Sequence, residues 1–236
     1  MVELAERMTP AARRQGWVAA DAQQLTASGR AQHPGVLTLW TIQSLGAWSR
    51  LQKDGVLRAD GRRVRRKYRR AYEWLARHMD ERLGCRPSER ALPLWAWYQW
   101  NGATCRKPDL RSCGHMPLGD GGVRIEFEIS DRRVLLSDFD LWHYVLNYWY
   151  LPESQRDDEA FESELSRRGL SFYKNKPLRH AAFHRKITES WARIFDLDWT
   201  DSGRSIAHPR ARKSIQASFW ELRRNQVRDV RIFRAR

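Results

Sequence analysis

Strict alternation of apolar and polar residues is the sequence feature that most restricts the fold of this chain. In residues 123–129 (VRIEFEI), apolar side chains take every second position and charged side chains take the positions between. The segment SIQASFWE near the C-terminus alternates in the same way and places Ile215, Ala217 and Phe219 on one face. Successive side chains of a strand point to opposite faces, so both segments predict strands with one buried face.

Helical patterns separate these strands. Residues 36–43 predict a buried strand, after which Ser44 suits a helix N-cap and Gly55 suits the end of that helix. Ser137 and Asp140 have the spacing of a capping box, which predicts a later helix that starts at Ser137. Further strands are expected at 56–60, 92–100 and 227–233, and further helices at 68–83, 137–152, 153–169 and 178–198.

The order of these elements lacks the regular alternation of strand and helix that parallel sheets require. It therefore predicts an α+β fold of split antiparallel sheets flanked by helices. Residues 1–35 carry little apolar periodicity and are expected to form a loosely ordered N-terminal extension. Residues 36–236 are expected to form a single α+β domain.

The chain is strongly basic, with 43 Lys and Arg residues against 28 Asp and Glu residues and a net charge of +15. Such a surface attracts polyanions, of which nucleic acid is the first candidate. An arginine run (RRVRRKYRR) leads into the helix expected at 68–83. The residues expected to bind nucleic acid are Arg63, Arg65, Arg66, Lys67 and Arg69. The alternative is that this run is only a solvated helix face.

Several common signatures are missing from the sequence. It contains no G-x-G-x-x-G fingerprint, P-loop, G-x-S-x-G elbow or H-E-x-x-H motif. The cysteines Cys85, Cys105 and Cys113, with His115, lack the paired spacing of zinc sites, so no metal is expected. No segment approaches the roughly 20 apolar residues of a membrane helix, and the N-terminus lacks the apolar region of a secretory signal. A cytoplasmic protein without a membrane partner is therefore expected.

Three long motifs carry a resemblance to a known family. They are LWTIQSLGAWSRLQKDGVLRAD, KPDLR and VLLSDFDLWHYVLNYWYLP, and through them the chain resembles a bacterial domain family of unknown function. More distantly, the first motif is similar to the first motif of the ADP-ribosyltransferases, in which a strand runs into a helix that ends at a glycine. The segment ELRRNQVRDVRIF resembles the ADP-ribosyltransferase strand that starts at the catalytic glutamate.

This distant resemblance implies an ADP-ribosyltransferase-like catalytic domain that uses NAD as a substrate. It makes Glu221 the catalytic glutamate, whose carboxylate stabilises the oxocarbenium-like charge that develops on the ribose. The residues it places at the NAD site are Trp40, Thr41, Gln43, Arg58 and Ser218. Alternatives are left open for stacking (Trp95, Trp97), for the pyrophosphate (Arg111) and for the middle motif (Tyr68, Tyr72).

The basic charge favours a nucleic-acid acceptor, with RNA preferred over DNA. Similar enzymes include toxins and phage-defence effectors, so an antitoxin protein is an expected partner. A protein acceptor is the alternative within this class. Two other classes are open: a non-catalytic nucleic-acid-binding module, in which Glu221 only forms a salt bridge, and a hydrolase or nuclease that uses Asp109, Asp138, His143 or Glu221.

Overall fold

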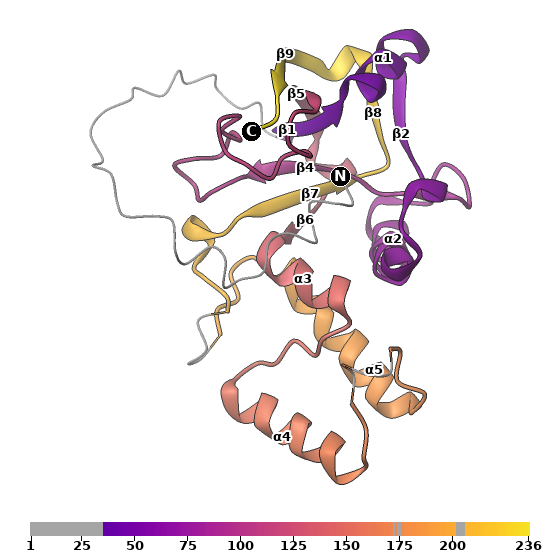
Figure 1. The fold of residues 1–236 in the computed structure, drawn as a ribbon, viewed down its shortest axis with the longest axis vertical. Helices are drawn as coiled ribbons and strands as arrows, with labels where there is room; N and C mark the ends of the chain where they lie inside the picture. The colour runs from indigo at the N-terminus through magenta and orange to yellow at the C-terminus, as the bar shows by residue number, and fades with distance from the viewer. Residues whose placement is uncertain (1–34, 172, 174–175, 202–205) are drawn as a thin grey trace.

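The computed structural model describes residues 35–171, 173, 176–201 and 206–236. The N-terminal extension expected at 1–35 therefore lies outside the described residues, except for Gly35. Within the described ranges the strands form two antiparallel sheets, one ordered β6-β7-β4-β1-β5-β9 and one ordered β3-β2-β8. Helices flank both sheets (Figure 1), which confirms the expected antiparallel sheets with flanking helices.

The strands are β1 (Val36–Ser44), β2 (Val56–Asp60), β3 (Ala91–Leu92), β4 (Leu94–Gln99), β5 (Gly121–Ser130), β6 (Leu135–Asp138), β7 (Ile215–Phe219), β8 (Glu221–Arg223) and β9 (Val227–Arg234). The α-helices are α1 (Leu45–Asp54), α2 (Arg69–Leu83), α3 (Phe139–Asn147), α4 (Gln155–Arg167) and α5 (Ala181–Ser190). Short 3-10 turns precede α2 at Arg66–Tyr68, link β5 to β6 at Asp131–Arg133 and extend α5 at Trp191–Phe195.

Local signals place the first elements as expected. The Ser44 side chain caps α1 by accepting a hydrogen bond from the Ala47 backbone N–H at 3.2 Å. Gly55 ends that helix with φ 71°, a left-handed conformation that glycine adopts at little cost. The chain then continues directly into β2. The predicted strand–helix–strand order at residues 36–60 is thus confirmed.

One hydrophobic core lies on the face of the larger sheet that β1 and β5 share with β4 and β7. The alternating residues of β5 supply its centre, since Val123, Ile125 and Phe127 are fully buried. Leu51 of α1 and Leu222 of β8 pack on the same cluster. Helix α1 and the smaller sheet therefore cover this face, which explains the one-sided apolar pattern in the sequence.

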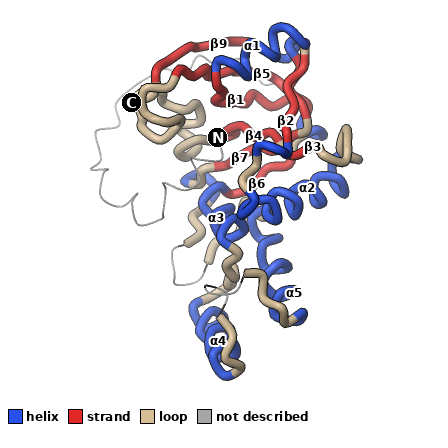
Figure 2. Tube along the Cα trace, turned by 45° about the vertical axis from the view of Figure 1, so that its right-hand side comes forward, coloured by secondary structure: helices blue, strands red, loops and turns tan. Residues whose placement is uncertain are grey.

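A second hydrophobic core joins the helices at the β6 edge of the larger sheet. It includes Trp74 of α2, Trp142 of α3, Ile187 of α5 and Trp191, with Leu135 of β6 as the contact to the sheet. Figures 1 and 2 show α3, α4 and α5 extending beyond that edge, while α2 lies beside β6. Six of the twelve tryptophans thus lie in this helical core or pack against it.

Two local predictions need correction. Ser137 does not start a helix; it lies in β6, where its hydroxyl oxygen accepts a hydrogen bond from Gln216 at 3.0 Å. Asp138 caps α3 instead. The helix was expected to reach residue 152, but α3 ends at Asn147 because Tyr148 adopts a left-handed φ of 59°. The pairing of β6 with β7 continues through Asp138 and holds that residue extended, so the N-cap lies one position later than predicted, at Asp138.

The described part of the chain contains no helix with both the length and the apolar character required to span a membrane.

Candidate functional site

Glu221, the carboxylate at the end of an apolar strand face, lies where the two sheets meet. The chain leaves β7 of the larger sheet, bends at Trp220, and enters β8 of the smaller sheet at Glu221. Arg58 on β2 is its register partner across the smaller sheet. Only 7% of Glu221 is exposed. Glu221 therefore interrupts the apolar face because the chain passes from one sheet to the other there. Its carboxylate is buried and does not reach into solvent at the end of a strand.

Three arginines from separate elements surround the Glu221 carboxylate, and we call them the arginine cluster. Arg58 donates from Nε and Nη2 to Oε2 at 3.1 and 2.7 Å. Arg223 donates from Nε to Oε1 at 2.7 Å, and Nη2 of Arg133 lies 3.5 Å from the same oxygen. Both carboxylate oxygens are thus in use, so a ligand that bonded to Glu221 would compete with an arginine.

Burial by itself raises the pKa of Glu221. The hydrogen bonds from Arg223 and Arg58 outweigh this effect, so the pKa lies below the ordinary value of 4.5. The carboxylate is therefore ionised at neutral pH. A groove of about 640 Å³ borders the cluster and is lined by Asp54, Gly55, Val56, Arg58, Arg223, Arg224 and Asn225.

The other residues expected to bind NAD have different surroundings. Trp40 donates from Nε1 to Glu126 at 2.8 Å on one face of the larger sheet. On the opposite face, Thr41 donates to the Trp95 carbonyl at 3.0 Å and accepts from Gln43 at 2.7 Å. Of the expected NAD-site residues, Arg58 contacts Glu221, whereas these hydrogen bonds of β1 hold the sheet together.

Ser218 of β7 is fully buried, and its hydroxyl has no hydrogen-bond partner within the described part of the chain. It lies between Trp95 of β4 and Leu135 of β6 in the register of the sheet. Trp95 and Trp97 contact the ring of Phe139 at the start of α3. These aromatic side chains therefore pack against α3.

The remaining alternatives also have structural partners. Asp109 binds Arg111 through paired hydrogen bonds, which lower its pKa to about 2. Asp138 forms a buried ion pair with Lys213 at 3.1 Å. Tyr72 is half-buried with its ring packed edge-on against Trp142, and desolvation raises the pKa of its hydroxyl to about 12. Each of these interactions accounts for its residue without reference to a ligand.

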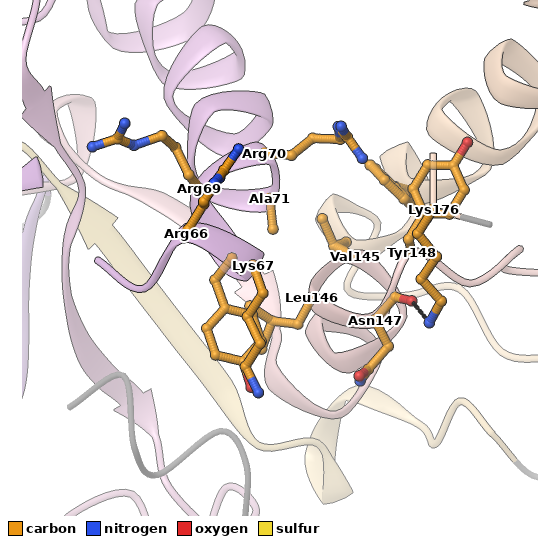
Figure 3. A pocket seen from close by; sticks show the side chains of 12 residues that line it. Arg66, Lys67, Arg69, Arg70, Ala71, Val145, Leu146, Asn147, Tyr148 and Lys176 are labelled. Atoms are coloured by element: carbon orange, nitrogen blue, oxygen red, sulfur yellow. Dashed lines mark hydrogen bonds between the residues drawn. The ribbon is translucent and has the colours of Figure 1, made fainter. Parts of the chain in front are cut away.

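A basic pocket of about 870 Å³ opens between the start of α2 and the end of α3. Its cationic residues are Arg66, Lys67, Arg69, Arg70 and Lys176, all of which are exposed. Figure 3 shows Arg66, Arg69 and Arg70 on the α2 side of this pocket; Arg70 extends toward Tyr148 and Lys176 on the other side, whereas the Arg69 side chain extends away from them. None of the described residues that line the pocket is acidic.

The floor of the basic pocket is apolar and buried. It consists of Tyr68, Ala71, Val145, Leu146, Tyr148 and Trp191. The ammonium of Lys67 lies 4.8 Å from the centre of the Tyr68 ring, and the Arg70 guanidinium lies 5.8 Å from that of Tyr148. Lys176 donates to the Asn147 carbonyl at 2.7 Å, the dashed contact in Figure 3. The pocket therefore combines a cationic rim with an apolar base.

The family comparison is consistent with the expected domain family of unknown function. The profile described as "Domain of unknown function (DUF3841)" matches residues 38–228. The chain belongs to the DUF3841 family. Comparison with curated proteins and comparison with solved structures gave no significant match.

The basic pocket of this DUF3841 chain contains part of the expected nucleic-acid-binding run. Arg66, Lys67 and Arg69 line it, whereas Arg65 is exposed but is not among the lining residues. The side chain of Arg63 lies outside the described residues.

Sequence reasoning missed two cations of the pocket in this DUF3841 chain. Arg70 continues the arginine run, so extending that run by one position would have found it. Lys176 belongs to the short lysine-rich segment KNKP, which no periodicity connects with α2. Only the packing of α3 and the following chain against α2 brings it to the pocket.

The cysteines do not form a metal centre in the part of the DUF3841 domain that the structure describes. Cys85 and Cys113 are exposed, and Cys105 is half-buried. His115 binds the Asp109 backbone carbonyl through Nε2 at 2.7 Å. No three His, Cys, Asp or Glu side chains within the described ranges are arranged to hold a metal ion.

Proposed function

We propose that this chain binds nucleic acid through the basic pocket. The observation that carries the proposal is that five cations, four at or just before the start of α2 and Lys176, line one hollow in which none of the described lining residues is acidic. Cations that line one hollow repel one another, with an energy that falls as their separation and the solvent screening increase. A polyanion relieves that repulsion and releases its own counterions on binding.

The start of α2 adds to this attraction. Tyr68 occupies the N-cap without a side-chain hydrogen bond, and the first turn of the helix contains no acidic residue. The N-terminus of a helix carries a partial positive charge and N–H groups that suit phosphate oxygens. At this N-terminus the helix dipole and the arginine side chains of the pocket favour the same ligand charge.

The test is fluorescence anisotropy with labelled RNA and DNA oligonucleotides over a range of NaCl concentrations. Five phosphate contacts to a single strand predict a slope of about −3.5 in log K against log salt, or about a 100-fold weaker affinity from 50 to 200 mM. The double variant Arg66→Gln/Arg70→Gln should reduce the size of that slope by about 1.4.

The matched control is Arg156→Gln/Arg167→Gln, which removes the same charge from exposed positions on α4. It should retain most of the affinity, whereas the pocket variant should lose about tenfold or more. Equal weakening by both double variants, with both folded, would show that only net charge matters and would refute the pocket as the binding site. Absence of binding at low salt would refute the function itself.

A second candidate function is NAD-dependent ADP-ribosyl transfer to nucleic acid. The observation that favours it is a buried, ionised carboxylate, Glu221, beside the arginine-lined groove. Arginine forks suit a pyrophosphate, and a fixed carboxylate stabilises positive charge on a ribose. In this reaction the bond from ribose C1 to nicotinamide breaks, C1 bonds to the acceptor atom, and the acceptor proton passes to solvent.

Incubation with labelled NAD and RNA, DNA or protein tests this candidate directly. Label should appear on one acceptor with release of nicotinamide, and folded Glu221→Gln should lose both signals. Label on protein alone would support the same transfer reaction with a protein in place of nucleic acid as the acceptor. No label on any acceptor and no nicotinamide release would eliminate the candidate, while nucleic-acid binding by the basic pocket would be unaffected.

A further inference from the structure

We propose that the basic pocket accepts an unpaired nucleotide, so that the chain recognises single-stranded nucleic acid in preference to a duplex. This inference rests on the proposed function and deepens it by naming the form of nucleic acid. It depends on features that net charge does not explain: the volume of the hollow, the apolar character of its floor, and the placement of cations on its rim.

The size of the pocket fits one nucleotide. Its volume of about 870 Å³ lies within the roughly 300–1,000 Å³ typical of small-molecule sites. A phosphate on the outside of a duplex needs a cationic surface and no hollow. The bases of a duplex are stacked and paired, so they cannot enter a pocket of this size without leaving the helix.

The floor of the pocket suits a flat, largely apolar base. Val145, Leu146 and Tyr148 from the end of α3 are each less than 10% exposed and line the hollow together with Trp191. These side chains are held by the helical core, so they are fixed before a ligand arrives. A base that enters the pocket exchanges water for apolar and aromatic contacts, which favours binding with little dependence on its sequence.

The cations lie where the phosphates of such a nucleotide would be. Arg66 and Lys67 lie in the 3-10 turn before α2 and Arg70 lies in the first turn of α2, while Lys176 lies on the opposite side beside Asn147 (Figure 3). A strand that places one base on the floor can therefore run its backbone past positive charge on both sides. Deep apolar contact and rim phosphate contact are the two elements of single-strand recognition.

Anisotropy titrations with three probes of equal length test this inference on the full chain. The probes are single-stranded oligothymidine, the corresponding duplex, and a strand of abasic tetrahydrofuran units with the same phosphate charge. The single strand should bind about tenfold or more tightly than either of the others, because covering the apolar floor with one base contributes on that order. The variant Leu146→Asn, which makes the floor polar without changing charge, should reduce the preference for bases over abasic units.

The outcomes separate the two proposals. Equal affinity for all three probes, with loss of binding in Arg66→Gln/Arg70→Gln, would overturn the single-strand inference and leave nucleic-acid binding in place. No binding of any probe would overturn both. Because Leu146 is buried and its variant could unfold, the comparison of abasic and oligothymidine probes on the unaltered chain decides the question independently.

Discussion

Replacement of Glu221 by glutamine is the most direct test of the arginine cluster. The change keeps the shape of the side chain but removes the one negative charge that Arg58, Arg133 and Arg223 share. A hydrogen bond to a charged group contributes about 1.5–3 kcal/mol when it is shielded from water. These arginine side chains are 49%, 52% and 56% exposed, whereas the glutamate side chain is 8% exposed, so solvent screens each pair considerably.

Exposed ion pairs contribute about 0–1 kcal/mol each, so the cluster should contribute about 1–2 kcal/mol in total to the free energy of unfolding. For a chain of this size that corresponds to a fall in Tm of about 2–8 °C. Urea denaturation followed by tryptophan fluorescence measures the difference. The control Glu189→Gln, at an exposed position on α5, should change stability by no more than about 0.5 kcal/mol.

The pH dependence gives this prediction a second readout. The pKa of Glu221 in the folded protein lies below the ordinary value of 4.5, so its stabilisation is fully present above pH 4.5. That contribution is lost as the pH falls through the lower folded-state pKa. The difference between parent and Glu221→Gln should therefore be constant from about pH 5 to 8 and shrink as the pH falls below 4.5. Equal stability of the two proteins at neutral pH and low salt would refute the reasoning.

Two further substitutions probe the sheet. Asp138→Asn keeps a side chain that can cap α3 but leaves Lys213 buried without its carboxylate partner. Urea denaturation should show that the free energy of unfolding falls by about 3–5 kcal/mol. Adding Lys213→Met should recover part of this loss, and no recovery would contradict the ion-pair explanation. Ser218→Ala removes a buried hydroxyl that has no partner in the described structure, so the free energy of unfolding should stay constant or rise by about 1 kcal/mol. A loss above that size would mean that the hydroxyl has a bonding partner.

Local signals were sufficient for much of the fold. The cap at Ser44 and the left-handed Gly55 act within a few residues, so the sequence around them already contains the information. The predicted helix start at Ser137 was wrong because a distant segment, and not the local sequence, decides the structure there. Its capping signal is real, but the ladder between β6 and β7, a strand distant in sequence, continues through Asp138, so the cap falls on Asp138. Local propensity predicts an element well when no distant partner competes for the same backbone.

The candidate sites divide in the same way. The sequence singled out Glu221 and Arg58 separately, yet they are 163 positions apart and only strand pairing makes them neighbours. The arginine run predicted a basic surface, but it does not predict the basic pocket. The hollow requires the end of α3 and Lys176 to lie opposite the start of α2, which depends on how the tryptophan-rich helical core is filled.

The sequence by itself determined most strand and helix positions, the one-sided sheet and the positive charge, because these follow from periodicity and composition. The tertiary structure decided that the alternating segment SIQASFWE is divided between β7 of the larger sheet and β8 of the smaller sheet. This division places the Glu221 carboxylate in the arginine cluster. It also decided that the basic residues surround a pocket with an apolar floor. Both outcomes depend on contacts between segments far apart in the chain, which hydrophobic packing and strand pairing fix only when the whole chain has folded.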